Sequence, residues 1–199
     1  MRADEALERL KAGNARYVRG EAGQGHVVSE ADLGAQDPVA VVVGCSDARV
    51  PVEMVLGQGW GELFVVRVAG HAVGPKVTAS VAYGVVQLGV ELVVVMGHRG
   101  CGAVSVAVDA LTPGKPEAPG HLEPLVRRLK PSVQPVVERY DGQTGEAVLA
   151  EAVKSHVHAS VDRLTEGLRR VGPSASAARV VGSVYDLETG WVQWLEGDV

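Results

Sequence analysis

Aromatic residues and cysteine are scarce in this sequence, and long hydrophobic runs are missing. Aromatic side chains make up 4% of the 199 residues, so valine, leucine and alanine must build the core that a hydrophobic content of 46% allows. No opening apolar segment resembles a signal peptide, and no apolar run is long enough to span a bilayer. These absences argue against a membrane protein and make the cytoplasm the expected location.

Positive charge is also limited. The 19 lysines and arginines are outnumbered by 24 aspartates and glutamates, which gives a formal net charge of -5 at pH 7. The sequence has no basic cluster that would offset this balance locally. A nucleic-acid-binding surface is therefore not expected.

Strands and helices are predicted to alternate through the first half of the chain. Valine-rich runs typical of strands buried on both faces occupy 38–43, 63–68 and 92–96, and later strands are expected at 178–185 and 191–195. Helices are predicted over 4–19, 52–56, 76–88, 103–111, 122–140 and 144–170, with the prolines of 122–140 kinking or dividing that helix. This order predicts an α/β fold with a mostly parallel sheet. One domain is expected over 1–199, with 1–34 as an N-terminal helical arm and connector.

The two cysteines stand in matching places. Cys45 follows the run 38–43, and Cys101 follows the run 92–96 with His98 three residues before it. Parallel packing would place these strands side by side, so the three side chains should meet at the carboxyl edge of the sheet, where open α/β sheets bind ligands. The helix that starts after Cys101 should make this thiol easier to ionise than a free cysteine. Two thiolates and an imidazole favour a zinc site over the alternative of two small core cysteines.

Three motifs carry a resemblance to a known family. CSDARVP at 45–51, FVVRVAGH at 64–71 and GHRGCGAV at 97–104 are together similar to the β-class carbonic anhydrases, and the likeness covers nearly the whole chain. The resemblance implies an enzyme with one zinc ion per chain that reversibly hydrates carbon dioxide to bicarbonate and a proton. It also implies four parallel strands extended by a C-terminal antiparallel strand, and a homodimer or a dimer of dimers.

The resemblance also assigns roles to individual residues. Cys45, His98 and Cys101 are implied as the zinc ligands, which leaves the open fourth position of a catalytic zinc. Asp47 and Arg49 are implied as a dyad, rather than a surface ion pair, in which Arg49 holds Asp47 and Asp47 orients a zinc-bound hydroxide. In a closed form, Asp47 itself becomes the fourth zinc ligand. Two thiolates cancel the charge of the ion, so this zinc should acidify its bound water less than a zinc held by three histidines does. The rate of hydration should therefore rise into the alkaline range.

The substrate pocket is a less specific part of the resemblance. Gln36 lies nine residues before Cys45, the spacing at which plant-type members carry a substrate-contacting glutamine. Phe64 and Tyr83 fall where those members carry pocket aromatics, although ordinary packing is a serious alternative for both. The N–H of Gly102, at a helix start, is expected to bind a bicarbonate oxygen. In the family, such a pocket is completed across the dimer.

Some positions depart from the family pattern. His71 stands where many members have an asparagine, and it is expected to be structural rather than a proton acceptor. Val42 replaces the tryptophan of an allosteric bicarbonate site found in some bacterial members, so no such site is expected. Gln36 and Val42 together favour an always-open form, with Asp47 away from the zinc.

Other histidines and the tryptophans are expected to be structural. His156 and His158 lie two residues apart on a predicted helix and face different ways, so they make a poor metal pair. Trp60, Trp191 and Trp194 are scattered along the chain and are interpreted as packing residues.

Three other functions fit part of the sequence. A carbonyl sulfide or carbon disulfide hydrolase could use the same zinc and dyad, and only an assay with both substrates separates it from a carbonic anhydrase. A non-catalytic zinc-binding or nucleotide-binding module is a different class, but the glycines at 97, 100 and 102 form the reverse of the dinucleotide fingerprint. A thiol redox protein is disfavoured because the chain has no C-x-x-C motif.

Overall fold

A five-stranded sheet in the order β2-β1-β3-β4-β5 forms the centre of the computed structural model, which describes residues 1–21 and 34–195. The strands are β1 (Ala40–Cys45), β2 (Leu63–Val68), β3 (Leu92–His98), β4 (Arg179–Tyr185) and β5 (Val192–Leu195). Strands β1 to β4 pair in parallel, and β5 pairs antiparallel with β4. The predicted α/β fold, with four parallel strands and a C-terminal antiparallel strand, is confirmed. Most of the predicted connector, residues 22–33, lies outside the described residues.

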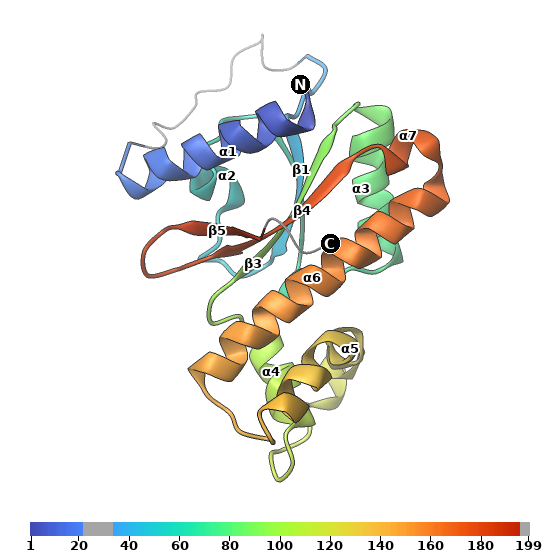
Figure 1. Cartoon of the computed structure of the whole chain (residues 1–199). Helices are drawn as coiled ribbons and strands as arrows, with labels where there is room; N and C mark the ends of the chain where they lie inside the picture. Colours follow the sequence, from blue (N-terminus) through green and yellow to red (C-terminus); the bar gives the residue numbers. More distant parts are fainter. Residues whose placement is uncertain (22–33, 196–199) are drawn as a thin grey trace.

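Helices cover both faces of this sheet (Figure 1). One face carries α1 (Ala3–Val18) and the short α2 (Val52–Val55), and the other carries α3 (Pro75–Gln87), α4 (Gly102–Leu111), α5 (Glu123–Arg139) and α6 (Glu146–Val171). Short helical turns η2 (Ala69–His71), η3 (Gly120–Leu122) and α7 (Pro173–Ser176) complete the described elements. Within the described ranges, none of these helices combines the length and the apolar character needed to cross a membrane.

Unbroken valine runs explain why the sheet is buried on both faces. Val41 and Val93 pack into the core shared with α3 to α6, whereas Val42 and Val94 pack into the core shared with α1 and α2. Successive side chains of a strand point to opposite faces, so a strand covered on both sides needs apolar residues at every position. This two-sided burial fixes the relative positions of β1 and β3, whose ends carry the candidate site.

The helix α5 is continuous, so of the two expected effects of its prolines, kinking or dividing the helix, division is wrong. Pro131 and Pro135 both lie inside the helix and are exposed. Their missing N–H groups leave the carbonyls of Arg127 and Pro131 without helical partners. Because the prolines lie on the solvent face, water can satisfy those carbonyls while the apolar face of the helix stays packed.

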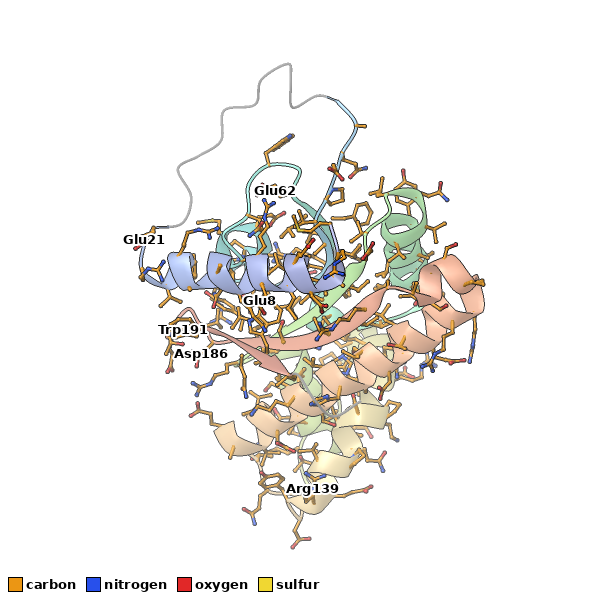
Figure 2. The ribbon with its side chains drawn as sticks, turned by 45° about the horizontal axis from the view of Figure 1, so that its top comes forward. Glu8, Glu21, Glu62, Arg139, Asp186 and Trp191 are labelled. Atoms are coloured by element: carbon orange, nitrogen blue, oxygen red, sulfur yellow. The ribbon has the colours of Figure 1, made fainter. Side chains whose placement is uncertain are left out.

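Two of the three tryptophans do not pack as expected. Trp60 and Trp191 are 58% and 51% exposed, whereas Trp194 packs against the core beneath α1. Figure 2 shows Trp191 beside Asp186 at the turn that joins β4 to β5, where the N–H of Asp186 donates to the carbonyl of Trp191. Within a single chain, the packing interpretation is therefore wrong for Trp60 and Trp191.

Candidate metal centre

The carboxyl ends of β1 and β3 bring both cysteines and His98 together. Cys45 is the last residue of β1, His98 is the last residue of β3, and Cys101 is the N-cap of α4. The two strands are neighbours in the sheet, and the Sγ atoms of Cys45 and Cys101 lie 3.9 Å apart. One ligand atom from each of the three buried residues lies within 4.8 Å of the other two. The structure thus assembles the three predicted ligands.

The geometry of these side chains fits a tetrahedral zinc ion. Zinc–sulfur bonds of about 2.3 Å at the tetrahedral angle place two sulfurs about 3.8 Å apart, close to the separation found here. Nδ1 of His98 lies 2.9 Å from the carbonyl oxygen of Arg99. A carbonyl can only accept, so Nδ1 carries the proton and Nε2 keeps its lone pair. This Nε2 atom is buried and has no hydrogen-bond partner among the described residues, as expected of an atom reserved for a metal.

The two thiols differ in acidity. The Cys101 thiol lowers the pKa of Cys45, helped by His98 and nearby backbone N–H groups and opposed by burial. Cys45 in turn raises the pKa of Cys101, and burial raises it further. Two N–H groups at the start of α4 act in the opposite direction, as expected, but they are outweighed. The expectation that Cys101 ionises more readily than a free cysteine is therefore wrong for the protein alone, although a bound zinc ion would deprotonate both thiols.

Asp47 and Arg49 form a fixed pair at the edge of the cluster. Arg49 donates to Oδ1 of Asp47 from its backbone N and from Nε, both over 3.0 Å, and to Oδ2 from Nη2 over 2.8 Å. These bonds hold the pKa of Asp47 well below its usual range, so the carboxylate is ionised at neutral pH. Oδ2 of Asp47 lies 3.8 Å from Nε2 of His98, which places the carboxylate beside the candidate ligands.

Two residues outside the predicted set hold the Cys45 loop. Arg67 of β2 donates from Nε to the carbonyl of Cys45 over 2.9 Å, and from Nη2 to the carbonyl of Asp47 over 2.6 Å. The N–H of Gly70 donates to Sγ of Cys45 over 3.3 Å. Both residues belong to the FVVRVAGH motif, which ends the strand next to β1. The place of this motif in the sequence could have identified both residues, because residues at the end of β2 can reach the loop that follows β1.

His71 and His156 are fully buried behind the cluster. Their ring centroids lie 4.6 Å apart, and neither ring nitrogen of His71 has a hydrogen-bond partner among the described residues. Nε2 of His156 lies 3.0 Å from the carbonyl oxygen of Gly70, and Nδ1 lies 2.8 Å from Oγ of Ser132. Because the carbonyl of Gly70 only accepts, Nε2 carries the proton and Nδ1 is an acceptor. The single proton of the Ser132 hydroxyl then faces two acceptors, Nδ1 of His156 and the carbonyl oxygen of Leu129, each 2.8 Å from Oγ. His156 therefore fixes the backbone of the residue that donates to Cys45.

Three of the predicted pocket residues are not brought to the cluster within one chain. Gln36 is exposed and precedes β1, and Phe64 pairs in register with the residue four positions before Cys45. Four residues of strand correspond to about 13 Å. Tyr83 of α3 is 49% exposed, and its ring centroid lies 5.9 Å from that of Phe64. Gly102, by contrast, is the first residue of α4 and directly follows Cys101.

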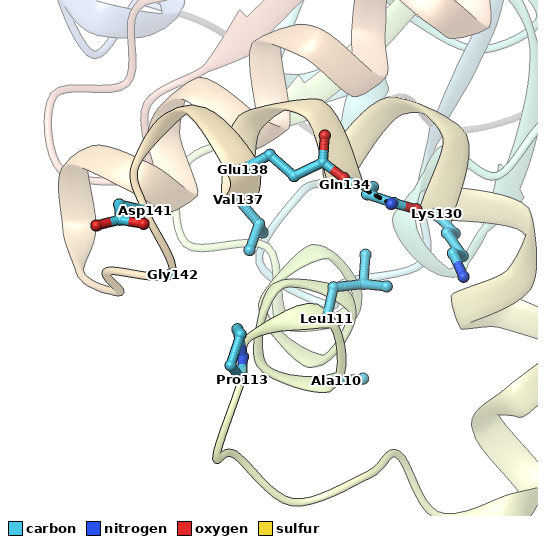
Figure 3. A pocket seen from close by; sticks show the side chains of 9 residues that line it. All are labelled: Ala110, Leu111, Pro113, Lys130, Gln134, Val137, Glu138, Asp141 and Gly142. Carbon is cyan, nitrogen blue, oxygen red and sulfur yellow. Dashed lines mark hydrogen bonds between the residues drawn. The ribbon is translucent and has the colours of Figure 1, made fainter.

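A cavity of about 560 Å³ lies away from this cluster, between α4 and α5 (Figure 3). Its wall includes Leu111, Lys130 and the hydrogen-bonded pair Gln134 and Glu138. None of the predicted ligand, dyad or pocket residues lines it. The size of a cavity is therefore no guide to the candidate site of this chain.

Comparisons with known proteins agree with the geometry. Residues 40–192 match the family model described as carbonic anhydrase. The chain is 37% identical over 193 residues to a carbonic anhydrase of Mycolicibacterium smegmatis, across 94% of this chain and 91% of that protein. It is also 37% identical over 190 residues to carbonic anhydrase 2 of Mycobacterium tuberculosis, across 93% of this chain and 89% of that protein.

A solved structure agrees as well. A chain from the crystal structures of two tetrameric β-carbonic anhydrases of Sordaria macrospora aligns with a TM-score of 0.72 and 25% identity, over 84% of this chain and 85% of that one. The span of the family match contains all three residues of the cluster and both residues of the dyad. The chain therefore belongs to the carbonic anhydrase family, in its β class.

Proposed function

We propose that the protein is a zinc-dependent carbonic anhydrase, a lyase that reversibly hydrates carbon dioxide to bicarbonate and a proton. The observation that carries this proposal is the buried cluster of Cys45, His98 and Cys101 with the ionised Asp47 beside it. These three ligands fit one zinc ion per chain and leave a fourth position for a reactant. Zinc, when bound, supplies a hydroxide nucleophile near neutral pH.

Asp47 and Arg49 are proposed to orient the attacking hydroxyl group. An ionised carboxylate can only accept, so Asp47 takes a hydrogen bond from the O–H and leaves an oxygen lone pair aimed at carbon dioxide. Arg49 keeps the carboxylate in one orientation through its three hydrogen bonds. Both oxygens of Asp47 accept from Arg49, which supports the open form in which Asp47 stays off the metal.

Gly102 is proposed to bind the product. As the first residue of α4, it has an N–H with no intrahelical partner. The amino terminus of a helix favours an anion, so this N–H can receive an oxygen of bicarbonate as negative charge develops. The residue directly follows Cys101, which keeps the donor next to the metal ligands.

We infer that a second copy of the chain completes each site. Strand β2 is a sheet edge, paired with β1 alone among the described strands, and Trp60 and Tyr83 near it are strongly exposed. A partner that covers this edge would bury both side chains, and would bring Gln36, Phe64 and Tyr83 of one chain toward the cluster of the other. A homodimer, alone or doubled into a tetramer, therefore fits better than a monomer.

The cytoplasm remains the proposed location. Both cysteines are free thiols in the structure, and their proposed role as metal ligands requires them to stay reduced. A reducing compartment maintains that state, whereas an oxidising one favours disulfides. Fractionation of cells with an antibody against the protein would test this proposal.

Stopped-flow hydration of carbon dioxide tests the proposed activity. The purified protein is assayed as isolated, after a chelator has removed its zinc, and after zinc has been restored. We expect turnover that disappears with the metal and returns with it. Faster hydrolysis of carbonyl sulfide or carbon disulfide would identify the other zinc hydrolase, and bound zinc without turnover on any substrate would indicate a non-catalytic module.

A further inference from the structure

A second cavity lies among the helices, away from the metal ligands. It has a volume of about 500 Å³ and is bounded by residues of α3, α5 and α6. Arg128, Arg163 and Arg170 line it, and Glu166 is the one acidic residue among the described lining residues. Glu166 accepts from Nε of Arg170 over 3.0 Å. Neither Arg128 nor Arg163 has an acidic partner in the described part of the chain, so two guanidinium groups in one cavity lack a counter-charge.

Arg163 shows the strongest requirement for a ligand. Its Nη1 atom is buried and has no hydrogen-bond partner among the described residues. Burial lowers the pKa of Arg163, and the positive charge of Arg128 lowers it further. A buried guanidinium N–H that no longer bonds to water and has no protein acceptor destabilises the folded state. Repulsion from the positive charge of Arg128 adds to this cost. An anion placed between the two arginines would offset the repulsion between their charges.

The start of α3 adds positive potential to the same cavity. Gly74, the N-cap of this 13-residue helix, lines the cavity and makes no side-chain cap. A Cβ atom on Gly74 would lie 3.8 Å from Nη2 of Arg128, so this guanidinium sits beside the helix start. The amino end of a helix carries a partial positive charge, which favours an anion in the same place as the two arginines do.

We propose that this cavity binds a phosphate monoester of a small organic molecule. A phosphate monoester carries a charge of about -2 at neutral pH, which matches the two guanidinium groups that no carboxylate neutralises. Guanidinium groups also pair with phosphate oxygens through parallel N–H donors. A phosphate group fills only part of the cavity, and Pro75, Ala79 and Val171 give the rest of the wall an apolar surface suited to the organic portion.

Isothermal titration calorimetry of the zinc-loaded protein tests this site with phenyl phosphate, inorganic phosphate and phenol as probes. We expect phenyl phosphate to bind one per chain, inorganic phosphate to bind more weakly, and phenol alone not to bind. Arg128→Gln and Arg163→Gln should each weaken phenyl phosphate binding by about tenfold or more, because each removes a charged hydrogen bond. Arg127→Gln is the matched control, since Arg127 is an exposed neighbour on α5 that does not line the cavity.

Several results would overturn the proposal. They are the absence of saturable phenyl phosphate binding, equal affinity in the wild type and both cavity variants, or equal binding of phenyl and inorganic phosphate. Loss of fold would not explain a negative result, because Arg163 has no hydrogen-bond partner to lose among the described residues, and Arg163→Gln without ligand should unfold at the wild-type temperature or above it. Carbon dioxide hydration should also be unchanged in both cavity variants, since neither arginine contacts the metal cluster, so this test is independent of the proposed enzymatic activity.

Discussion

Among single residues, Cys45 and Asp47 are neighbours in one loop but are expected to have separable roles. Cys45→Ala removes a sulfur ligand, so zinc and turnover should be lost together. Asp47→Ala leaves the three ligands in place, so zinc should stay while turnover falls by about a hundredfold, the effect expected when one orienting group is lost from an active site. Metal analysis and stopped-flow assays on both variants check this, and full activity in Asp47→Ala would remove Asp47 from the mechanism.

His156 is expected to make stability depend on pH in the acid range. Burial lowers the pKa of His156 to about 4, whereas a histidine in an unfolded chain titrates at about 6.5. Between these values the unfolded chain binds a proton that the folded chain does not. The free energy of unfolding should therefore fall as the pH is lowered from about 6.5 to about 4, by up to about 1.4 kcal/mol per pH unit.

Urea unfolding of the wild type and His156→Gln across this pH range measures that contribution. The variant should be less stable at pH 7, because the hydrogen bonds to Gly70 and Ser132 are altered. Its stability should nevertheless fall less steeply with acid than that of the wild type. Acid also competes with zinc for the thiolates, but this effect is common to both proteins, so parallel curves would show that His156 does not titrate as described.

At the scale of elements, the turn η2 connects the helical layer to the metal cluster. Gly70 adopts a left-handed backbone with a φ of 59°, donates its N–H to Cys45 and accepts from His156 through its carbonyl. A Cβ atom at this position would lie 3.0 Å from the Cβ of Ala103. Gly70→Ala should therefore lower the free energy of unfolding by about 1–3 kcal/mol, from backbone strain and overpacking, and should speed zinc release.

Urea unfolding and the rate of zinc transfer to a chelator measure both effects. Gly120→Ala is the matched control, because Gly120 lacks a left-handed φ and a Cβ atom there would meet nothing within 4 Å. The control should behave like the wild type. A Gly70→Ala protein that kept wild-type stability and zinc release would show that the turn does not support Cys45.

Particular elements show how much of the structure the sequence could predict. The strands β1 and β3 were predictable, because two-sided burial demands unbroken apolar runs, and their ends located the candidate ligands. The continuity of α5 could not be predicted from the sequence, because it depends on Pro131 and Pro135 facing solvent, which only the packed structure reveals. The raised pKa of Cys101 could not be predicted for a similar reason, since it depends on Cys45, which lies 56 residues away in the chain.

For the whole molecule, the separation of pocket and metal cluster within one chain predicts activity shared between subunits. Asp47→Ala and Gln36→Ala homodimers should both be impaired, the first in the dyad and the second in the pocket. A heterodimer of the two should contain one complete site, made from Asp47 of one chain and Gln36 of the other. Co-expression in equal amounts should therefore restore about a quarter of the wild-type activity per chain, because half of the dimers are mixed and each has one working site.

Differently tagged chains allow the mixed dimers to be purified and assayed directly. Each mixed dimer should then show about half of the wild-type activity, one site of two. Activity no higher than the average of the two homodimers would mean that Gln36 serves its own chain, and would contradict the shared pocket. The single domain over 1–199 stays a prediction at this scale, which limited proteolysis can address.

The proposed activity depends most directly on two sulfurs and one imidazole nitrogen around a single zinc ion. X-ray absorption at the zinc edge of the purified protein measures these neighbours. We predict two sulfur scatterers at about 2.3 Å and two nitrogen or oxygen scatterers at about 2.0–2.1 Å, one of them from His98. A zinc-free protein, or a zinc ion surrounded only by nitrogen and oxygen, would contradict the assignment of Cys45, His98 and Cys101 as the metal site.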